Sequence, residues 1–85
     1  DPDFRREWEE QEPRFQLIKA ILMGREENHL SQKQLSEKTG ITQADISRLE
    51  AGDANPTLDT ICRIAKGLGM NLKLVFERAQ ISEFA

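Results

Sequence analysis

The sequence predicts a mainly α-helical protein, in which a bundle of five helices is followed by one β-strand. Three observations support this fold class. Apolar residues recur every three to four positions in residues 14–28 and 58–68, which is the spacing of a buried helix face. Residues 30–52 carry two helix-capping patterns on either side of a glycine. In residues 70–77 the apolar residues alternate, which is the spacing of a strand.

The N-terminal segment, residues 3–11, places Phe4 and Trp8 one helical turn apart among charged residues. Pro13 is expected to end or bend this first helix, because proline lacks an amide hydrogen and its ring clashes with the preceding turn. So short a helix is not stable alone in water. We therefore expect residues 1–12 to form an arm or helix that packs either on its own domain or on a partner.

The second helix is predicted over residues 14–28. Its apolar face consists of Phe15, Ile18, Ile21 and Leu22. Gly24 lies inside this helix, although glycine lowers helix stability by about 1 kcal/mol relative to alanine, and the sequence offers no reason for it. His29 is the one histidine of the chain. No second metal ligand lies near it in sequence, so we interpret it as a surface loop residue.

Residues 30–52 predict two short helices joined by a tight turn. Ser31 and Gln34 have the spacing of a capping box, and Thr42 and Asp45 repeat that spacing. Gly40 falls just past the end of the first of these two helices, where a positive φ redirects the chain at no steric cost. Two capped helices that meet at a sharp angle make a helix-turn-helix.

The second helix of this pair is predicted to bury Ile46 and Leu49 and to expose small and polar side chains. The exposed set is Gln43, Ala44, Ser47, Arg48 and Ala51. Glutamine can pair with adenine and arginine with guanine, while alanine methyls can contact thymine methyls. Such a face suits the major groove of DNA and equally suits an ordinary solvated helix, so its composition alone leaves both interpretations open.

The last predicted helix covers residues 58–68, after a loop rich in turn-forming residues and a capping Thr57. Its apolar face consists of Leu58, Ile61, Cys62, Ala65 and Leu68. Cys62 is therefore predicted to lie in the core. As the single cysteine of the chain, it cannot form an internal disulfide.

Residues 70–77 (MNLKLVFE) are predicted to form a β-strand with Leu72, Leu74 and Phe76 on one face; continued helix is the competing interpretation. No other segment reads as a strand, so both edges would be left unpaired. We therefore expect residues 70–78 to pair with the same strand of a second copy in a two-fold symmetric homodimer. Residues 79–85 are expected to form a frayed tail.

Composition limits the function further. The net charge of −3 is unusual for a nucleic-acid-binding protein, but the excess lies in residues 1–16, with six acidic and three basic residues. No apolar run is long enough to span a membrane and the N-terminus does not resemble a signal peptide, so a cytoplasmic protein is expected. The sequence lacks a Ser-His-Asp set, a Cys/His metal spacing and a glycine-rich phosphate loop, so no enzyme, metal or cofactor is expected.

The run SQKQLSEKTGITQADISRLEAG resembles the signature of the Xre- and Cro-type helix-turn-helix domains of lambdoid phage repressors. The resemblance covers residues 15–69 and implies a lambda-repressor-like domain, here residues 13–69, that binds a double-stranded DNA operator. It also implies a structural ion pair between Arg25 and Glu50. The residues implied to contact DNA are Gln32, Lys33, Thr42, Gln43, Ala44, Ser47, Arg48 and Asn55.

The whole arrangement of helices and strand is similar to the HigA- and HipB-like antitoxins of type II toxin–antitoxin modules. This similarity implies a homodimer that represses its own operon and neutralises a ribonuclease toxin of the RelE/HigB type. The residues that would bind the toxin are Phe4, Trp8 and Phe15. The alternative is a stand-alone Xre-family transcriptional repressor without a toxin partner.

Overall fold

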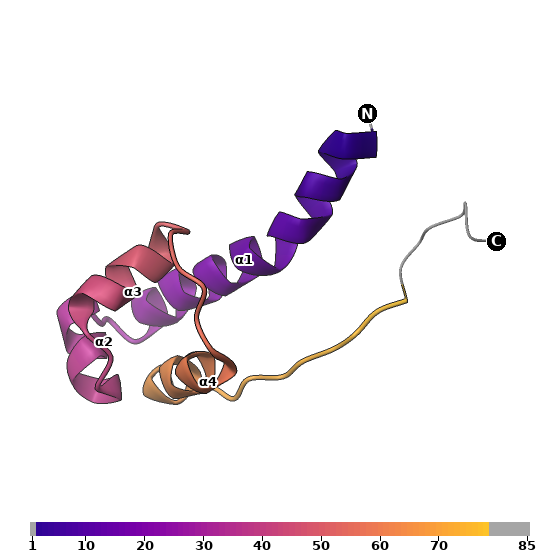
Figure 1. Ribbon diagram of the computed structural model, residues 1–85. Coiled ribbons are helices and arrows are strands. Elements are labelled where there is room, and N and C mark those ends of the chain that lie inside the picture. Colours follow the sequence, from indigo (N-terminus) through magenta and orange to yellow (C-terminus); the bar gives the residue numbers. More distant parts are fainter. Residues whose placement is uncertain (1, 79–85) are drawn as a thin grey trace.

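The computed structural model describes residues 2–78 and, in the first helix, the side chains from residue 12 onward. This part of the chain contains four helices: α1 (Pro2–Glu27), α2 (Gln32–Thr39), α3 (Gln43–Glu50) and α4 (Leu58–Gly67). Helix α2 packs against α3 and α4, and α1 packs against α3. The N-terminal end of α1, in indigo, projects beyond the other helices (Figure 1). Among the described residues, no helix combines the length and hydropathy required to cross a membrane.

The prediction of five helices is wrong, because α1 continues through Pro13 as one helix of 26 residues. A proline inside a helix removes one backbone hydrogen bond and crowds the carbonyl four residues earlier. The bonds of the turns on either side are unaffected, so the helix can continue past the proline at a local cost. The predicted boundary between an arm (residues 1–12) and a domain (residues 13–69) therefore falls inside a continuous helix.

The core lies where the four helices meet. Its buried residues are Ile21, Leu35, Ile41, Ile46, Leu49, Ile64 and Leu68. Partly buried Leu17, Leu30 and Ala54 pack against this cluster. Burying one such aliphatic side chain contributes roughly 1.5–3 kcal/mol, so the three short helices α2, α3 and α4 depend on this shared cluster rather than on helix propensity.

The predicted caps and turn of the helix-turn-helix are present in the structure. The Ser31 hydroxyl accepts from the Gln34 amide at 3.0 Å, and the Ser31 amide donates to the Gln34 side chain at 2.8 Å. The Thr42 hydroxyl accepts from the Asp45 amide at 3.1 Å. Gly40 has φ 77° and its amide donates to the Ser36 carbonyl, which ends α2. Local hydrogen bonds thus fix both helix starts and the turn between them.

Gly24 has a packing reason that the sequence did not reveal. A Cβ atom at this position would lie 2.8 Å from Cδ1 of Leu68, whose side chain is only 4% exposed. The missing side chain lets α1 approach the end of α4. Asn28 fastens the same contact, because its side-chain amide donates to the carbonyls of Gly24 and Leu68 at 2.7 and 3.0 Å.

The predicted core face of α4 is partly wrong. Leu68 is buried as expected, but Leu58 is 56% exposed and Cys62 is exposed, while Ile64 is buried at 2% exposure. Apolar residues on α4 form two overlapping stripes, and only tertiary packing against α1 and α2 decides which of them faces the core. Cys62 is therefore a surface residue.

Residues 70–78 do not form the predicted strand in this single chain; they run as an extended segment away from α4 (Figure 1). Leu74 and Val75 are each 67% exposed and Phe76 is fully exposed, whereas Leu72 is partly buried. A strand requires a neighbour for its backbone hydrogen bonds, and no other part of residues 2–78 supplies one. The expected tail at residues 79–85 lies outside the described residues.

Candidate nucleic-acid interface

Helix α3 separates a buried face from an exposed face. Ile46 and Leu49 are 0% and 5% exposed and fasten the helix to the core. The opposite side is solvent-accessible along the whole helix. The predicted DNA-contacting residues on or just before it, all exposed, are Thr42, Gln43, Ala44, Ser47 and Arg48. The helix therefore presents one amide, one guanidinium and small side chains on a single outward surface.

The Arg48 side chain forms an ion pair on that surface. Its guanidinium donates to the carboxylate of Asp45, one turn earlier on the same helix, while the Arg48 side chain stays 63% exposed. This bond from Arg48, together with a bond from Thr42, lowers the pKa of Asp45 below its ordinary value. Asp45 thus remains charged and holds Arg48 alongside α3, so a base contact by Arg48 must share the guanidinium with Asp45 or release it.

Gln32, predicted to bind a phosphate, lies at the start of α2 and is fixed by Glu50 at the end of α3. Its Nε2 donates to Oε1 of Glu50 at 2.8 Å. The same carboxylate accepts hydrogen bonds from Nε and Nη2 of Arg25, each at 2.8 Å. Burial raises the pKa of Glu50, but the hydrogen bonds from Arg25 and Gln32 lower it by more than burial raises it. The pKa of Glu50 therefore lies below its ordinary value. One N–H of the Gln32 amide remains to donate to another acceptor.

A hollow of about 390 Å³ lies between the turn, α3, the following loop and the start of α4. Thr42, Arg48 and Asn55 all line it, so the structure brings these three predicted residues together. Arg63 of α4 also lines the hollow. The sequence interpretation did not include this arginine, which donates to the carbonyl of Thr39 at 2.9 Å. Arg63 and Thr39 are 24 positions apart in the sequence, so no local sequence pattern predicts this contact.

A second arginine that sequence reasoning did not include, Arg14, joins α1 to the loop between α3 and α4. Its Nη1 donates to the Ala54 carbonyl at 2.9 Å, and its Nη2 donates to Oδ1 of Asn55. Asn55, predicted to contact a phosphate, is exposed. This contact also joins residues some 40 positions apart, so only the folded chain reveals it.

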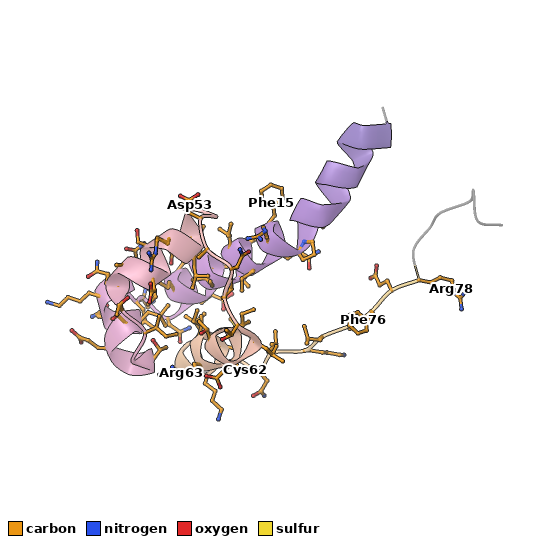
Figure 2. The ribbon with its side chains drawn as sticks, viewed as in Figure 1. Phe15, Asp53, Cys62, Arg63, Phe76 and Arg78 are labelled. Carbon is orange, nitrogen blue, oxygen red and sulfur yellow. The ribbon has the colours of Figure 1, made fainter. Side chains whose placement is uncertain are left out.

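The remaining predicted site residues do not line this hollow or lie on α3. Lys33 is exposed on α2. Phe15 projects from α1 and is 49% exposed (Figure 2). The side chains of Phe4 and Trp8 lie outside the described part of the structure. Among the described residues, no group of three or more His, Cys, Asp and Glu side chains could hold a metal ion.

Two short capped helices at a sharp turn, with a buried face and a polar outward face on the second, define a helix-turn-helix protein. A family model described as "Helix-turn-helix" matches residues 18–75. The chain therefore belongs to the helix-turn-helix family. Its resemblance to Xre-type domains and to HigA- and HipB-like antitoxins is confirmed by the relatives described next.

Three relatives show the range of names within the family. An uncharacterized HTH-type transcriptional regulator of Haemophilus influenzae is 39% identical over 62 residues, covering 73% of this chain and 63% of that protein. Antitoxin HigA1 of Mycobacterium tuberculosis is 31% identical over 83 residues, covering 98% and 56%. Antitoxin HipB of Escherichia coli is 37% identical over 59 residues, covering 69% and 67%. The chain thus spans only about six tenths of the length of the first two relatives.

A solved structure gives the same result. A chain of a toxin–antitoxin module from Streptococcus pneumoniae is 33% identical, with a TM-score of 0.69, and the match covers 85% of this chain and 80% of that chain. The relatives are transcriptional regulators and antitoxins, which are not enzymes. By sequence and by fold, the chain is therefore similar to helix-turn-helix proteins that are named transcriptional regulators and antitoxins.

Proposed function

We propose that this protein is a sequence-specific DNA-binding antitoxin that represses its own operon as a homodimer and neutralises a RelE/HigB-type ribonuclease toxin. The observation that carries the proposal is the outward face of α3, where Gln43, Ser47 and Arg48 are exposed while Ile46 and Leu49 fix the helix. A rigid helix with such side chains suits the major groove, where glutamine and arginine read adenine and guanine. The names of relatives HigA1 and HipB support the antitoxin role.

The backbone contacts of the proposed complex come from residues around this helix. Gln32 and Lys33 at the start of α2 and Asn55 in the loop after α3 offer N–H donors to phosphates. Gln32 is already oriented by Glu50. These contacts fix the position of α3 on the duplex, while Gln43, Ala44, Ser47 and Arg48 distinguish bases.

The homodimer is proposed from residues 70–78. Their extended backbone and exposed Leu74, Val75 and Phe76 leave apolar side chains and hydrogen-bonding groups without cover in one chain. Antiparallel pairing with the same segment of a second copy, along Leu72, Leu74 and Phe76, would satisfy both. A two-fold dimer also supplies the two recognition helices that a pseudo-palindromic operator requires.

The toxin-binding surface is proposed on α1. Because α1 is continuous through Pro13, a rotation of about 100° per residue sets positions 4, 8 and 15 within about 40° of one another around the helix axis. Positions 4, 8 and 15 thus share one stripe of the helix, whose N-terminal part belongs to the end of α1 that projects beyond the bundle (Figure 1). Aromatic side chains of this kind are common centres of protein–protein interfaces.

A binding experiment tests the proposal. Labelled DNA from the region upstream of the protein's own gene would be titrated with the protein, with and without the product of the neighbouring gene. We expect protection of a two-fold symmetric site and a stable complex with the neighbouring protein. Binding to DNA without any complex would favour a stand-alone repressor, in line with the Haemophilus influenzae relative named a transcriptional regulator. Failure to bind any duplex would refute the DNA-binding function.

A further inference from the structure

We propose that Arg14 is a positioning residue for the DNA interface: it holds the Asn55 side-chain amide so that its NH₂ group faces a DNA phosphate. This inference rests on the proposed DNA-binding function and adds a residue of α1, far from α3 in sequence, to the interface. Arg14 acts through Asn55 rather than on the DNA itself.

The first step is the geometry of the contact. The guanidinium of Arg14 uses two of its nitrogens on two successive loop residues, the Ala54 carbonyl at 2.9 Å and Oδ1 of Asn55. Arginine is a planar group with donors in a fixed arrangement. Two simultaneous bonds therefore fix both the backbone of the loop and the rotation of the Asn55 side chain.

The loop itself is held against α1 at further points. Ala54 packs on the hydrophobic core, and Gly52 lies against Ile18, whose Cδ1 would be 3.7 Å from a Cβ on the glycine. Pro56 restricts the backbone of Asn55 to extended conformations. The main chain of the loop is thus well fixed, and the exposed Asn55 side chain is the part that still requires orientation.

The chemistry of the amide then decides which end is available. Arginine only donates hydrogen bonds, so it must take the oxygen of the Asn55 amide. A phosphate only accepts, so it requires the nitrogen. The bond to Arg14 therefore leaves the two N–H groups of Asn55 for an outside acceptor. Asn55 lines the same hollow as Arg48 and Arg63. Asp45, which is paired with Arg48, also lines it, so Arg63 supplies the remaining positive charge there.

The test is a double-mutant cycle on DNA affinity. The probe is a duplex of about 30 base pairs, long enough for two half-sites, selected from a random library by the wild-type protein. Arg14→Ala and Asn55→Ala should each weaken binding by roughly tenfold, the effect of losing a charge-assisted hydrogen bond per site. The double variant should be no weaker than either single variant beyond about twofold. Lys19→Ala, which removes an exposed cation from the same helix, serves as the control and should bind as the wild type does.

Salt dependence separates positioning from direct contact. If Arg14 acts through Asn55, Arg14→Ala should leave the slope of log affinity against log salt unchanged. If Arg14 neutralises a phosphate, the magnitude of the slope should fall by about 0.9 per lost contact. Asn55→Asp provides a variant that keeps the acceptor for Arg14 but replaces the donor by a carboxylate. It should retain the wild-type unfolding midpoint and lose affinity at least as much as Asn55→Ala.

The outcomes against the inference are distinct from those against the proposed function. Additive losses in the double variant, or a shallower salt slope for Arg14→Ala, would overturn the positioning role while the protein still binds DNA. Wild-type affinity in Asn55→Asp would overturn it as well, without relying on any variant that removes Arg14. A wild-type protein that selects no duplex would instead refute DNA binding, and the role of Arg14 with it.

Discussion

Arg25 and Glu50 form a two-point ion pair between the last turn of α1 and the end of α3, with Nε and Nη2 of the arginine each 2.8 Å from a carboxylate oxygen. The pair is well covered, because the side chains are 20% and 8% exposed. Arg25 also donates to the Leu30 carbonyl at 3.1 Å, and Gln32 donates to the same carboxylate. One carboxylate therefore links α1, α2 and α3 beside the proposed phosphate contact.

Glu50→Gln should lower the free energy of unfolding by roughly 2–3 kcal/mol, because it leaves the Arg25 charge largely covered without its counter-ion. Urea unfolding followed by circular dichroism would measure the loss. Glu37→Gln is the matched control, because Glu37 is exposed on α2. This substitution should change the free energy of unfolding by less than about 0.5 kcal/mol. Equal losses in the two variants would mean that the ion pair adds nothing beyond an ordinary surface charge.

Stability should also depend on pH through Glu50. Its pKa in the folded protein lies below the ordinary 4.5, so folding favours the charged form. The stabilisation is complete above the pKa of the unfolded chain and is lost as the pH falls through the folded value. The free energy of unfolding of the wild type should therefore fall more steeply than that of Glu50→Gln between about pH 5.5 and pH 3. Parallel curves would contradict this prediction. The pKa of Asp45 is also lowered. Because Asp45 is present in both the wild type and Glu50→Gln, its effect cancels in the comparison.

Gly24→Ala should destabilise the protein, although alanine is the better helix former by about 1 kcal/mol. The added Cβ would lie 2.8 Å from Cδ1 of Leu68, and forcing extra volume into a packed contact costs about 1–3 kcal/mol. Thermal unfolding would give the sign. Glu26→Ala, at an exposed position of the same helix, should be neutral or slightly stabilising. A higher midpoint for Gly24→Ala would show that Leu68 moves aside freely.

The helix-turn-helix could be predicted from the sequence because its signals are local. Ser31 with Gln34, Thr42 before Asp45 and the positive φ of Gly40 each involve residues a few positions apart, and the structure contains all of them. Periodicity likewise predicted which side of α3 is buried. Where neighbouring residues determine the structure, the sequence pattern was sufficient.

The remaining features depend on contacts between distant residues. The local effect of a proline predicts that a helix ends or bends at Pro13, whereas the structure continues α1 through it. The face of α4 required knowledge of its neighbours, so Cys62 was predicted in the core and Ile64 was not. Arg14 and Arg63 contact residues 24 or more positions away. Residues 70–78 were read as a strand whose proposed partner belongs to a second copy of the chain.

Trp8→Ala should weaken binding to the product of the neighbouring gene by more than tenfold if the stripe on α1 binds the toxin, because buried tryptophans dominate such interfaces. Affinity for operator DNA should not change, since position 8 belongs to the N-terminal part of α1, which projects beyond the other helices (Figure 1). The control is Glu10→Ala, whose position lies about 160° around the helix from position 8. If Trp8→Ala binds the toxin within about twofold of the wild-type affinity, the stripe on α1 is not the toxin-binding surface.

Gln43→Ala and Gln32→Ala should affect DNA binding in different ways. Gln43 is exposed on α3, so its loss should cost about 1–3 kcal/mol at one base position per half-site and relax the preference there. Gln32 would donate to a phosphate, so its loss should weaken binding to all sequences alike. Competition titrations with a set of single-base variants of the operator would separate the two patterns. The same selective loss in both variants would exclude a backbone role for Gln32.

The salt dependence of wild-type binding should be shallow, because few cations surround the proposed interface. Lys33 and Arg48 are the basic residues among the predicted contacts, and Arg48 is already paired with Asp45. Each neutralised phosphate contributes about −0.9 to the slope of log affinity against log salt, so two to three contacts per subunit predict a slope between about −3.6 and −5.4 for a dimer. Fluorescence anisotropy at increasing salt concentrations measures this slope directly. A slope steeper than about −8 would require cations that the outward surface of α3 and its neighbours does not provide, and would place the DNA on another face of the protein.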